Sequence, residues 1–233
     1  MCENTSMSAN IEQPVPGRLH VLVQIYALHD DFIKNRDLAC RAGCDLCCTR
    51  NVTMTSLEAG LIIRHLEKTG QQGLLTHLQK SAALPRFRPL TTTNTLAHLC
   101  RNGQTPPEEV CDPAWRPCPL LADSRCPIYA VRPFACRCMV STSVCQKGGQ
   151  AEMEDYLLAL HTVFMQFIEH ADAAGHTGNL IDMLTVPAAQ RREGGRRSEN
   201  GFIPNRPIDM ILLPPEYQAR ARELVSALTS LFQ

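Results

Sequence analysis

Apolar side chains recur at helical spacing along most of this chain. The pattern predicts helices within residues 16–39, 55–70, 73–84, 93–103, 151–175, 179–186 and 214–232. The helix within 55–70 is the best marked, because Thr55 and Glu58 have the spacing of a capping box and Gly70 can end it. The longest, within 151–175, carries one apolar stripe formed by Tyr156, Leu157, Leu160, Phe164, Phe167 and Ile168.

Residues 105–138 break this pattern. Prolines come too often there for a long helix, and the segment has too few apolar runs to build a core of its own. It therefore needs a crosslink within the chain. We expect a mainly α fold, a helical bundle that clamps this irregular cysteine-rich segment, with few or no short strands. We expect one domain over residues 1–233, with a metal-chelating cysteine cluster within 40–145 and a C-terminal helical part over 150–233.

Composition indicates where the protein works. At 233 residues and 25.9 kDa the chain can bury a core without disulfides, and its 23 basic and 23 acidic side chains give no overall attraction to nucleic acid or to anionic membranes. No apolar run approaches the roughly 20 residues that cross a bilayer. The first ten residues lack the basic start and apolar core of an export signal. We therefore expect a cytoplasmic protein whose thiols are kept reduced.

Cysteine is concentrated in two stretches. Of 12 cysteines, four lie within residues 40–48 and six within 111–145. Clustered thiols in a reducing compartment indicate metal binding or catalysis more often than disulfides.

In the first stretch, two residues separate Cys44 from Cys47, a spacing at which one turn can present two thiolates to a metal. Three residues separate Cys40 from Cys44, and Cys48 follows Cys47 directly. Because neighbouring side chains diverge, we expect one thiol of the Cys47–Cys48 pair to serve a second centre or to stay free. A reversible disulfide between these two cysteines is the alternative.

The second stretch holds Cys111, Cys118, Cys126, Cys136, Cys138 and Cys145 at irregular intervals. No single ligand loop has this spacing, so we expect a site assembled from two distant segments, residues 40–48 and 118–145. The candidate metal ligands are Cys40, Cys44, Cys47, Cys48, Cys118, Cys126, Cys136, Cys138 and Cys145. Metal binding would then contribute folding free energy to the proline-rich segment.

Arginine accompanies the second stretch. Residues 111–145 contain four arginines, Arg116, Arg125, Arg132 and Arg137, against Asp112 and Asp123. Four thiolates around a divalent ion leave about two negative charges, which nearby guanidinium groups can offset. We expect Arg132 and Arg137 to support the centre in this way, and the alternative is that they are ordinary surface residues.

The stretches CRAGCDLCC (residues 40–48) and CPLLADSRCPIYAVRPFACR (118–137) resemble the CxxCxxCC cysteine-cluster family, which is described as zinc- or iron-chelating. The matching elements are Cys47-Cys48, Cys118-Pro119-Leu120, Cys126-x-Ile128-Tyr129 and Arg132-Pro133-x-x-Cys136-Arg137, within about residues 40–145. The spacing from Cys40 to Cys44 is one residue longer than the family name implies. Either Cys138 or Cys145 would match the eighth cysteine of the family. The resemblance implies metal chelation without implying one reaction, and some relatives are similar to the cysteine-rich part of flagellin lysine N-methylases.

The residues leave the metal open between zinc and an iron–sulfur cluster. Soft thiolates select these two over magnesium or calcium. Eight or nine clustered cysteines exceed one tetrahedral zinc site, and no histidine lies inside either stretch, which leans toward iron–sulfur. The eight histidines lie mostly on predicted helices, where we expect surface or hydrogen-bonded residues rather than ligands: His20, His29, His65, His77, His98, His161, His170 and His176.

Three functions compete. The first is a metal-binding protein that chelates zinc or an iron–sulfur cluster. The alternative is a cluster-dependent redox or group-transfer enzyme that modifies a protein, using a spare thiol such as Cys48 or Cys138, although no GxGxxG, phosphate loop or HExxH supports catalysis. The third, nucleic-acid binding, would use Arg191, Arg192, Arg196 and Arg197. We expect a solvated loop over 187–207 instead, because the net charge is zero and aromatic residues make up only 5% of the chain.

Overall fold

The computed structural model describes residues 16–41, 43–109, 116–146, 150–187, 190 and 201–233. Within them the protein is mainly helical, as predicted, with one small sheet. The helices are α1 (Pro16–Ile33), α2 (Ser56–Lys68), α3 (Gly73–Lys80), α4 (Thr93–Arg101), the 3₁₀ turn η1 (Tyr129–Val131), α5 (Phe134–Arg137), α6 (Asp155–Ala171), α7 (Leu180–Thr185) and α9 (Pro215–Ser230). No helix in these ranges is long and apolar enough to cross a membrane.

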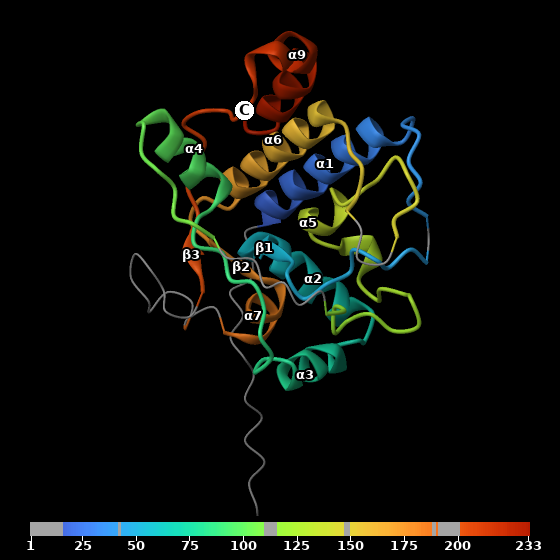
Figure 1. Cartoon of the computed structure of the whole chain (residues 1–233). Coiled ribbons are helices and arrows are strands. Elements are labelled where there is room, and N and C mark those ends of the chain that lie inside the picture. Colours follow the sequence, from blue (N-terminus) through green and yellow to red (C-terminus); the bar gives the residue numbers. More distant parts are fainter. Residues whose placement is uncertain (1–15, 42, 110–115, 147–149, 188–189, 191–200) are drawn as a thin grey trace, which may run out of the picture.

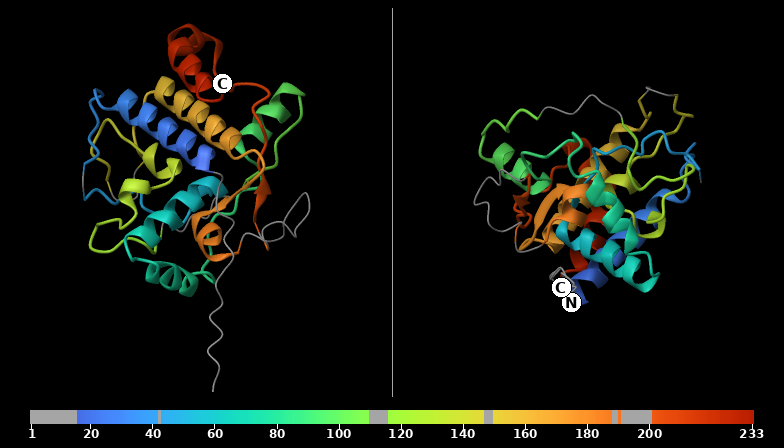
Figure 2. Two further views of the ribbon diagram at one scale, coloured as in Figure 1. Left: turned by 180° about the vertical axis from the view of Figure 1, so that it is seen from behind. Right: turned by 90° about the horizontal axis from the view of Figure 1, so that it is seen from below.

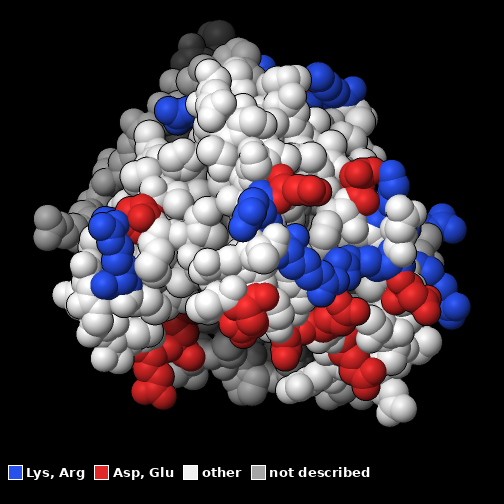
Figure 3. Space-filling model, turned by 90° about the horizontal axis from the view of Figure 1, so that it is seen from above, with Lys and Arg blue, Asp and Glu red and all other residues white. Residues whose placement is uncertain are grey.

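The helices are stacked in layers (Figures 1 and 2). Helices α1 and α6 lie side by side and antiparallel across the middle of the molecule, and α9 covers α6 from above in Figure 1. Below them lie α2, α7 and α3. Basic and acidic side chains are neighbours on the face seen from above (Figure 3), so this face presents no broad field of one sign.

Local sequence signals account for most helix positions. The predicted capping box is present at the start of α2, where the Thr55 side chain accepts from the Glu58 amide and the Glu58 side chain accepts from the Thr55 amide. Asp172 adds to this N-terminus, since its carboxylate accepts from the Leu57 amide at 3.0 Å. All six residues of the predicted apolar stripe on α6 are buried. Pro215 occupies the first turn of α9, where its missing N–H costs no hydrogen bond.

Two large hydrophobic cores result, and a smaller cluster of Tyr156, Leu160 and Ala221 lies between α6 and α9. The upper core lies between α1, α6 and α9 and includes Leu22, Phe164 and Phe134. The lower core lies between α2, α3, α7 and the segment of residues 118–131, where Leu120 and Ile128 are buried. The cysteine-rich segment thus contributes to both cores, although it has little regular structure.

The sheet has three short antiparallel strands in the order β1 (Thr53–Thr55), β2 (His176–Asn179) and β3 (Ile203–Pro204). Met54 pairs with Gly178, and Thr177 pairs with Ile203. Strand β3 falls inside residues 187–207, which the sequence predicts as a loop. The sheet matters for the site because β1 begins five residues after Cys48.

Candidate metal centre

The two cysteine-rich stretches lie side by side. Thr49 and Pro117 form an antiparallel bridge, in which the Cys118 amide donates to the Cys48 carbonyl at 2.9 Å and the Arg50 amide donates to the Arg116 carbonyl at 3.1 Å. Figures 1 and 2 show the same two segments adjacent from opposite sides. The structure therefore brings together the two distant segments that the cysteine spacing predicts.

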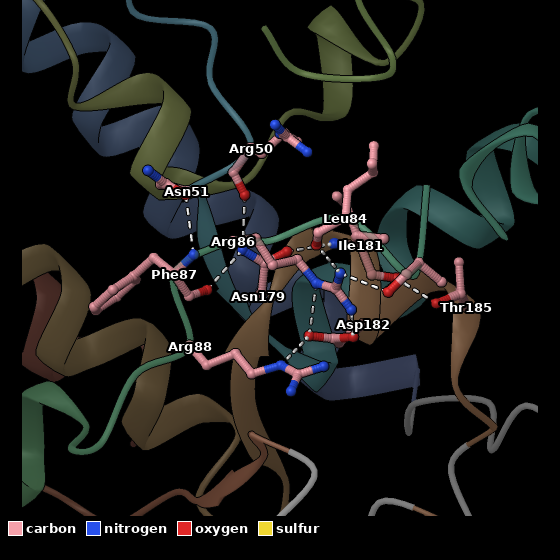
Figure 4. Close-up of polar contacts among 11 residues, drawn as sticks. Arg50, Asn51, Leu84, Arg86, Phe87, Arg88, Asn179, Ile181, Asp182 and Thr185 are labelled. Atoms are coloured by element: carbon pink, nitrogen blue, oxygen red, sulfur yellow. Dashed lines mark hydrogen bonds and ion pairs between the residues drawn. The ribbon is translucent and has the colours of Figure 1, made fainter. Parts of the chain in front are cut away.

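The chain just after Cys48 is held by the sheet and α7 (Figure 4). The Asn179 side-chain amide donates to the carbonyls of Arg50 at 2.7 Å and Phe87 at 2.9 Å, while its oxygen accepts from the Ile181 amide at the start of α7. The Asn51 side chain accepts from the Phe87 amide at 3.0 Å. These hydrogen bonds fix the backbone that follows the adjacent residues Cys47 and Cys48.

A buried ion pair holds the segment that contains Phe87 against α7. The Arg86 guanidinium is 4% exposed and pairs with the Asp182 carboxylate, which is 5% exposed. Arg86 also donates to the carbonyls of Ala82 and Leu84, both at 2.7 Å. Arg88 adds a longer contact to Asp182 (Figure 4). The pair positions Phe87, and through it the segment of residues 49–52.

A tight turn separates Cys118 from Cys126. Asp123 and Ser124 have φ angles of 50° and 57°, and Ala122 and Arg125 exchange two backbone hydrogen bonds of 3.0 and 2.8 Å across them. Two consecutive positive φ angles are typical of a type I′ turn, in which Asp is tolerated. The Ser124 hydroxyl donates to the Asp45 carboxylate at 2.7 Å, so this turn also contacts the first cysteine stretch.

Cys136 is positioned by a buried carboxylate. Glu58 of α2 accepts from the Phe134 amide at 2.7 Å and from the Tyr26 hydroxyl at 2.7 Å. It thereby caps the first turn of α5, which carries Cys136. One carboxylate thus links α1, α2 and α5.

One cavity of about 670 Å³ lies between the two stretches. Its lining includes seven cysteines, Cys40, Cys44, Cys47, Cys48, Cys118, Cys126 and Cys136. The remaining wall is mostly apolar, with Leu120, Leu180 and Val140 among its residues. Among the described residues, there is no group of three or more Cys, His, Asp or Glu side chains that is already arranged to hold a metal ion. The thiols share a cavity, and would have to close further around an ion.

The other cysteines lie elsewhere. Cys138 packs against the upper core with its thiol donating to the Ala135 carbonyl at 3.5 Å, and burial raises its pKa to about 12. Cys145 is half-buried and outside the cavity wall, and Cys100 is exposed on α4. Cys2 and Cys111 fall outside the described residues, as do Arg191, Arg192, Arg196 and Arg197.

Several thiols in the cavity have a raised pKa and hold their protons more strongly than a free cysteine. Burial raises the pKa of Cys118, Cys126 and Cys136. The hydrogen bond between the side chains of Cys47 and Cys48 raises the pKa of Cys47 and lowers that of Cys48. A cation that binds here must displace protons, which makes binding pH-dependent.

The two predicted arginines line the same cavity. Arg132 lies over the Tyr129 ring, 3.8 Å from its centroid, and donates to the Tyr129 carbonyl at 2.9 Å. Arg137 is buried, and its guanidinium donates to the Ala130 carbonyl at 2.8 Å and to the Asp30 carboxylate at 3.2 Å. Arg137 thus braces the wall of the cavity, and contact of either side chain with a bound metal stays a prediction.

Arg50 was not among the predicted residues. Its side chain is 6% exposed, and its Nε and Nη1 atoms have no hydrogen-bond partner in the described part of the chain. Figure 4 shows its guanidinium turned away from the Arg86–Asp182 pair. A buried cation without a counter-charge is costly. Its position two residues after Cys48 is consistent with a negatively charged centre nearby.

A pair of buried histidines was missed as well. His29 of α1 and His161 of α6 are 0% and 1% exposed, and their Nε2 atoms lie 3.2 Å apart. Both rings pack against Phe134, with centroids 4.8 and 6.0 Å away. Phe134 belongs to α5, so the histidine pair packs against this helix. Nothing in the spacing of two histidines more than a hundred residues apart could have predicted this contact.

Comparison with known proteins adds no further constraint on this site. No protein-family model matches the chain, and neither a search of curated proteins nor a search of solved structures finds a match. The resemblance to the CxxCxxCC family stays a prediction from the residues at positions 40–48 and 118–137.

Proposed function

We propose that the protein binds a thiolate-ligated metal, zinc or an iron–sulfur cluster, in the cavity between residues 40–48 and 118–136. One observation carries the proposal, namely that seven cysteines from two paired chain segments line this one cavity. Thiolates are soft ligands and select these metals over magnesium or calcium. The donor chemistry of the wall therefore fits the metal that the sequence predicts.

Charge supports the same proposal. Four thiolates around a divalent ion carry about two negative charges. Arg132 and Arg137 lie on the cavity wall, and the Nε and Nη1 atoms of the buried Arg50, two residues after Cys48, have no hydrogen-bond partner among the described residues. Cationic side chains beside a metal–thiolate centre stabilise its charge and orient its ligands.

The role that follows is a clamp. The described residues 116–146 contain only the single-turn helices η1 and α5 and short turns between isolated bridges. A metal bound by both stretches would join this segment to residues 40–48, and the free energy of binding would stabilise the fold. We place the protein in the cytoplasm, because all ten cysteines in the described residues are unpaired thiols.

Hydrogen exchange tests the clamp. The protein is purified without oxygen from cells supplied with iron and zinc, and amide exchange is followed by mass spectrometry before and after treatment with a strong chelator. We expect exchange over residues 116–146 to rise at least tenfold after chelation, while α1 and α6 stay protected. The Cys100→Ser variant should behave like the unmodified protein, because Cys100 is exposed on α4. Equal protection of residues 116–146 with and without chelator would contradict the proposal.

A second function, a cluster-dependent redox or group-transfer enzyme, is favoured by the size of the cavity. A volume of about 670 Å³ exceeds what one ion needs and falls in the range of small-molecule sites. Under this proposal the visible absorption of the loaded protein bleaches on addition of dithionite and returns on oxidation. Protein that contains zinc alone, with no band that responds to dithionite, would count against it.

A further inference from the structure

The thiols around the cavity are held by different parts of the fold. One group is attached to the bridge between the two stretches and to the lower core. The Cys118 amide donates to the Cys48 carbonyl, and Cys118 and Cys126 both pack against the lower core. Cys136 stands on α5, and Cys48, Cys118, Cys126 and Cys136 all line the same cavity. We call Cys48, Cys118, Cys126 and Cys136 the inner set.

The other group lies toward the solvent. The Ala39 amide donates to the Ser141 carbonyl at 2.8 Å, which places Cys40 beside the segment that leads to Cys145. Cys44 follows a turn closed by its own amide and the Arg41 carbonyl at 3.0 Å. Cys40, Cys44 and Cys47 line the cavity, and Cys145 lies outside its wall, four residues after Ser141. We call Cys40, Cys44, Cys47 and Cys145 the outer set.

Cys47 and Cys48, which are adjacent in the sequence, connect the outer set to the inner set. The Cys48 backbone is fixed by the bridge to Cys118, whereas Cys47 lies inside the turn that the Cys48 amide and the Asp45 carbonyl close at 2.9 Å. Cys138, the remaining candidate, is committed to the upper core and to the Ala135 carbonyl. Eight thiols remain, and both a tetrahedral zinc ion and a four-iron cluster take four cysteines each.

We propose that the protein holds two metal centres, one on the inner set and one on the outer set, joined through the adjacent residues Cys47 and Cys48. This inference rests on the proposed function and specifies its ligands and the number of centres. The sets differ in exposure, since Cys40 and Cys44 are exposed while all four inner cysteines are partly buried. The outer centre should therefore lose its metal to a chelator first.

Titration with Co²⁺ tests the division. The reduced, metal-free full chain is titrated without oxygen, and binding is followed by the thiolate-to-cobalt absorption and the d–d bands of tetrahedral cobalt. The variants are Cys44→Ser in the outer set, Cys126→Ser in the inner set, and the combination of both. Cys100→Ser is the matched control, because Cys100 belongs to neither set. Far-ultraviolet circular dichroism checks that each variant keeps its helices.

We expect the unmodified chain and Cys100→Ser to saturate at two Co²⁺ per chain. Each single variant should keep one tetrahedral thiolate-bound Co²⁺, so its absorption falls about twofold, and the combination should bind none. Cobalt of Cys44→Ser should also be removed more slowly by a chelator than cobalt of Cys126→Ser.

Saturation of the unmodified chain at one Co²⁺ would overturn the two-centre inference and leave the proposed function standing. Loss of all cobalt in both single variants, with their helices intact, would overturn it in the same way. If a variant loses its helices, the stoichiometry of the unmodified chain decides. No thiolate-bound cobalt at all would overturn the proposed function itself.

Discussion

Acidification should destabilise this protein through the two histidines buried between α1 and α6. His29 and His161 are 0% and 1% exposed, with their Nε2 atoms 3.2 Å apart. Burial lowers the pKa of His29 to about 4 and that of His161 to about 3. Both rings are therefore neutral in the folded protein at neutral pH, and His29 packs edge-on against the aromatic rings of Phe134 and Phe164.

The size of the effect follows from proton linkage. A histidine in the unfolded chain takes up a proton near pH 6.5, whereas these rings do so only near pH 4 and below. Between these values the unfolded state binds more protons, so stability falls as the pH falls. At pH 5 each ring lowers the free energy of unfolding by about 2 kcal/mol.

Asp172 opposes this loss. Its pKa is raised to about 6 by burial, so the folded protein takes up a proton there before the unfolded chain does. Between pH 7 and pH 5 this uptake stabilises the fold by about 1 kcal/mol. The net loss at pH 5 from these three groups is then about 3 kcal/mol.

Urea unfolding at pH 7 and pH 5, followed by circular dichroism, measures the difference. The double variant His29→Leu with His161→Leu should lose about 4 kcal/mol less than the unmodified protein over this interval. Release of a bound metal at low pH would affect both proteins alike and cancels in the comparison. His77→Gln, at an exposed position on α3, is the control and should keep the full loss. An equal pH dependence in the double variant and the unmodified protein would refute the argument.

Four substitutions test the surroundings of the site. Arg86→Leu leaves the Asp182 carboxylate buried without its main partner and should cost about 3–5 kcal/mol in urea unfolding, whereas Arg88→Ala, at a half-exposed position, should cost less than about 1 kcal/mol. Equal costs for these two would contradict the account. Glu58→Gln replaces one carboxylate oxygen that can accept hydrogen bonds from buried amide and hydroxyl donors. It should lower the free energy of unfolding by about 2 kcal/mol, and amide exchange at α5 should increase. Cys138→Ala should keep the full metal content, because its thiol faces the upper core, and loss of metal in this variant would place Cys138 among the ligands.

Helix positions could be predicted from the sequence because their causes are local. The capping box of α2 and the apolar stripe of α6 need only residues a few positions apart. The sheet could not be predicted in this way. Strand β2, with the sequence HTGN, has no alternating pattern, and it exists because Met54 and Ile203 bring two other segments to its edges.

The cysteine spacing predicted which segments meet, but not how they meet. The bridge between Thr49 and Pro117 and the turn at Asp123 and Ser124 follow from tertiary contacts. The different surroundings of Cys136 and Cys138 could be derived only once α5 was known. Residues two apart on a helix point about 200° away from each other, so one thiol faces the cavity and the other the core.

The most direct test is the metal and acid-labile sulfide content of protein purified without oxygen, together with its visible absorption spectrum. Our account predicts bound metal in stoichiometric amount, either zinc in colourless protein or iron with sulfide in brown protein. It also predicts that Cys118→Ser combined with Cys136→Ser lowers this content. Protein that stays folded with all its thiols free and holds neither metal, although both were supplied, would contradict the account.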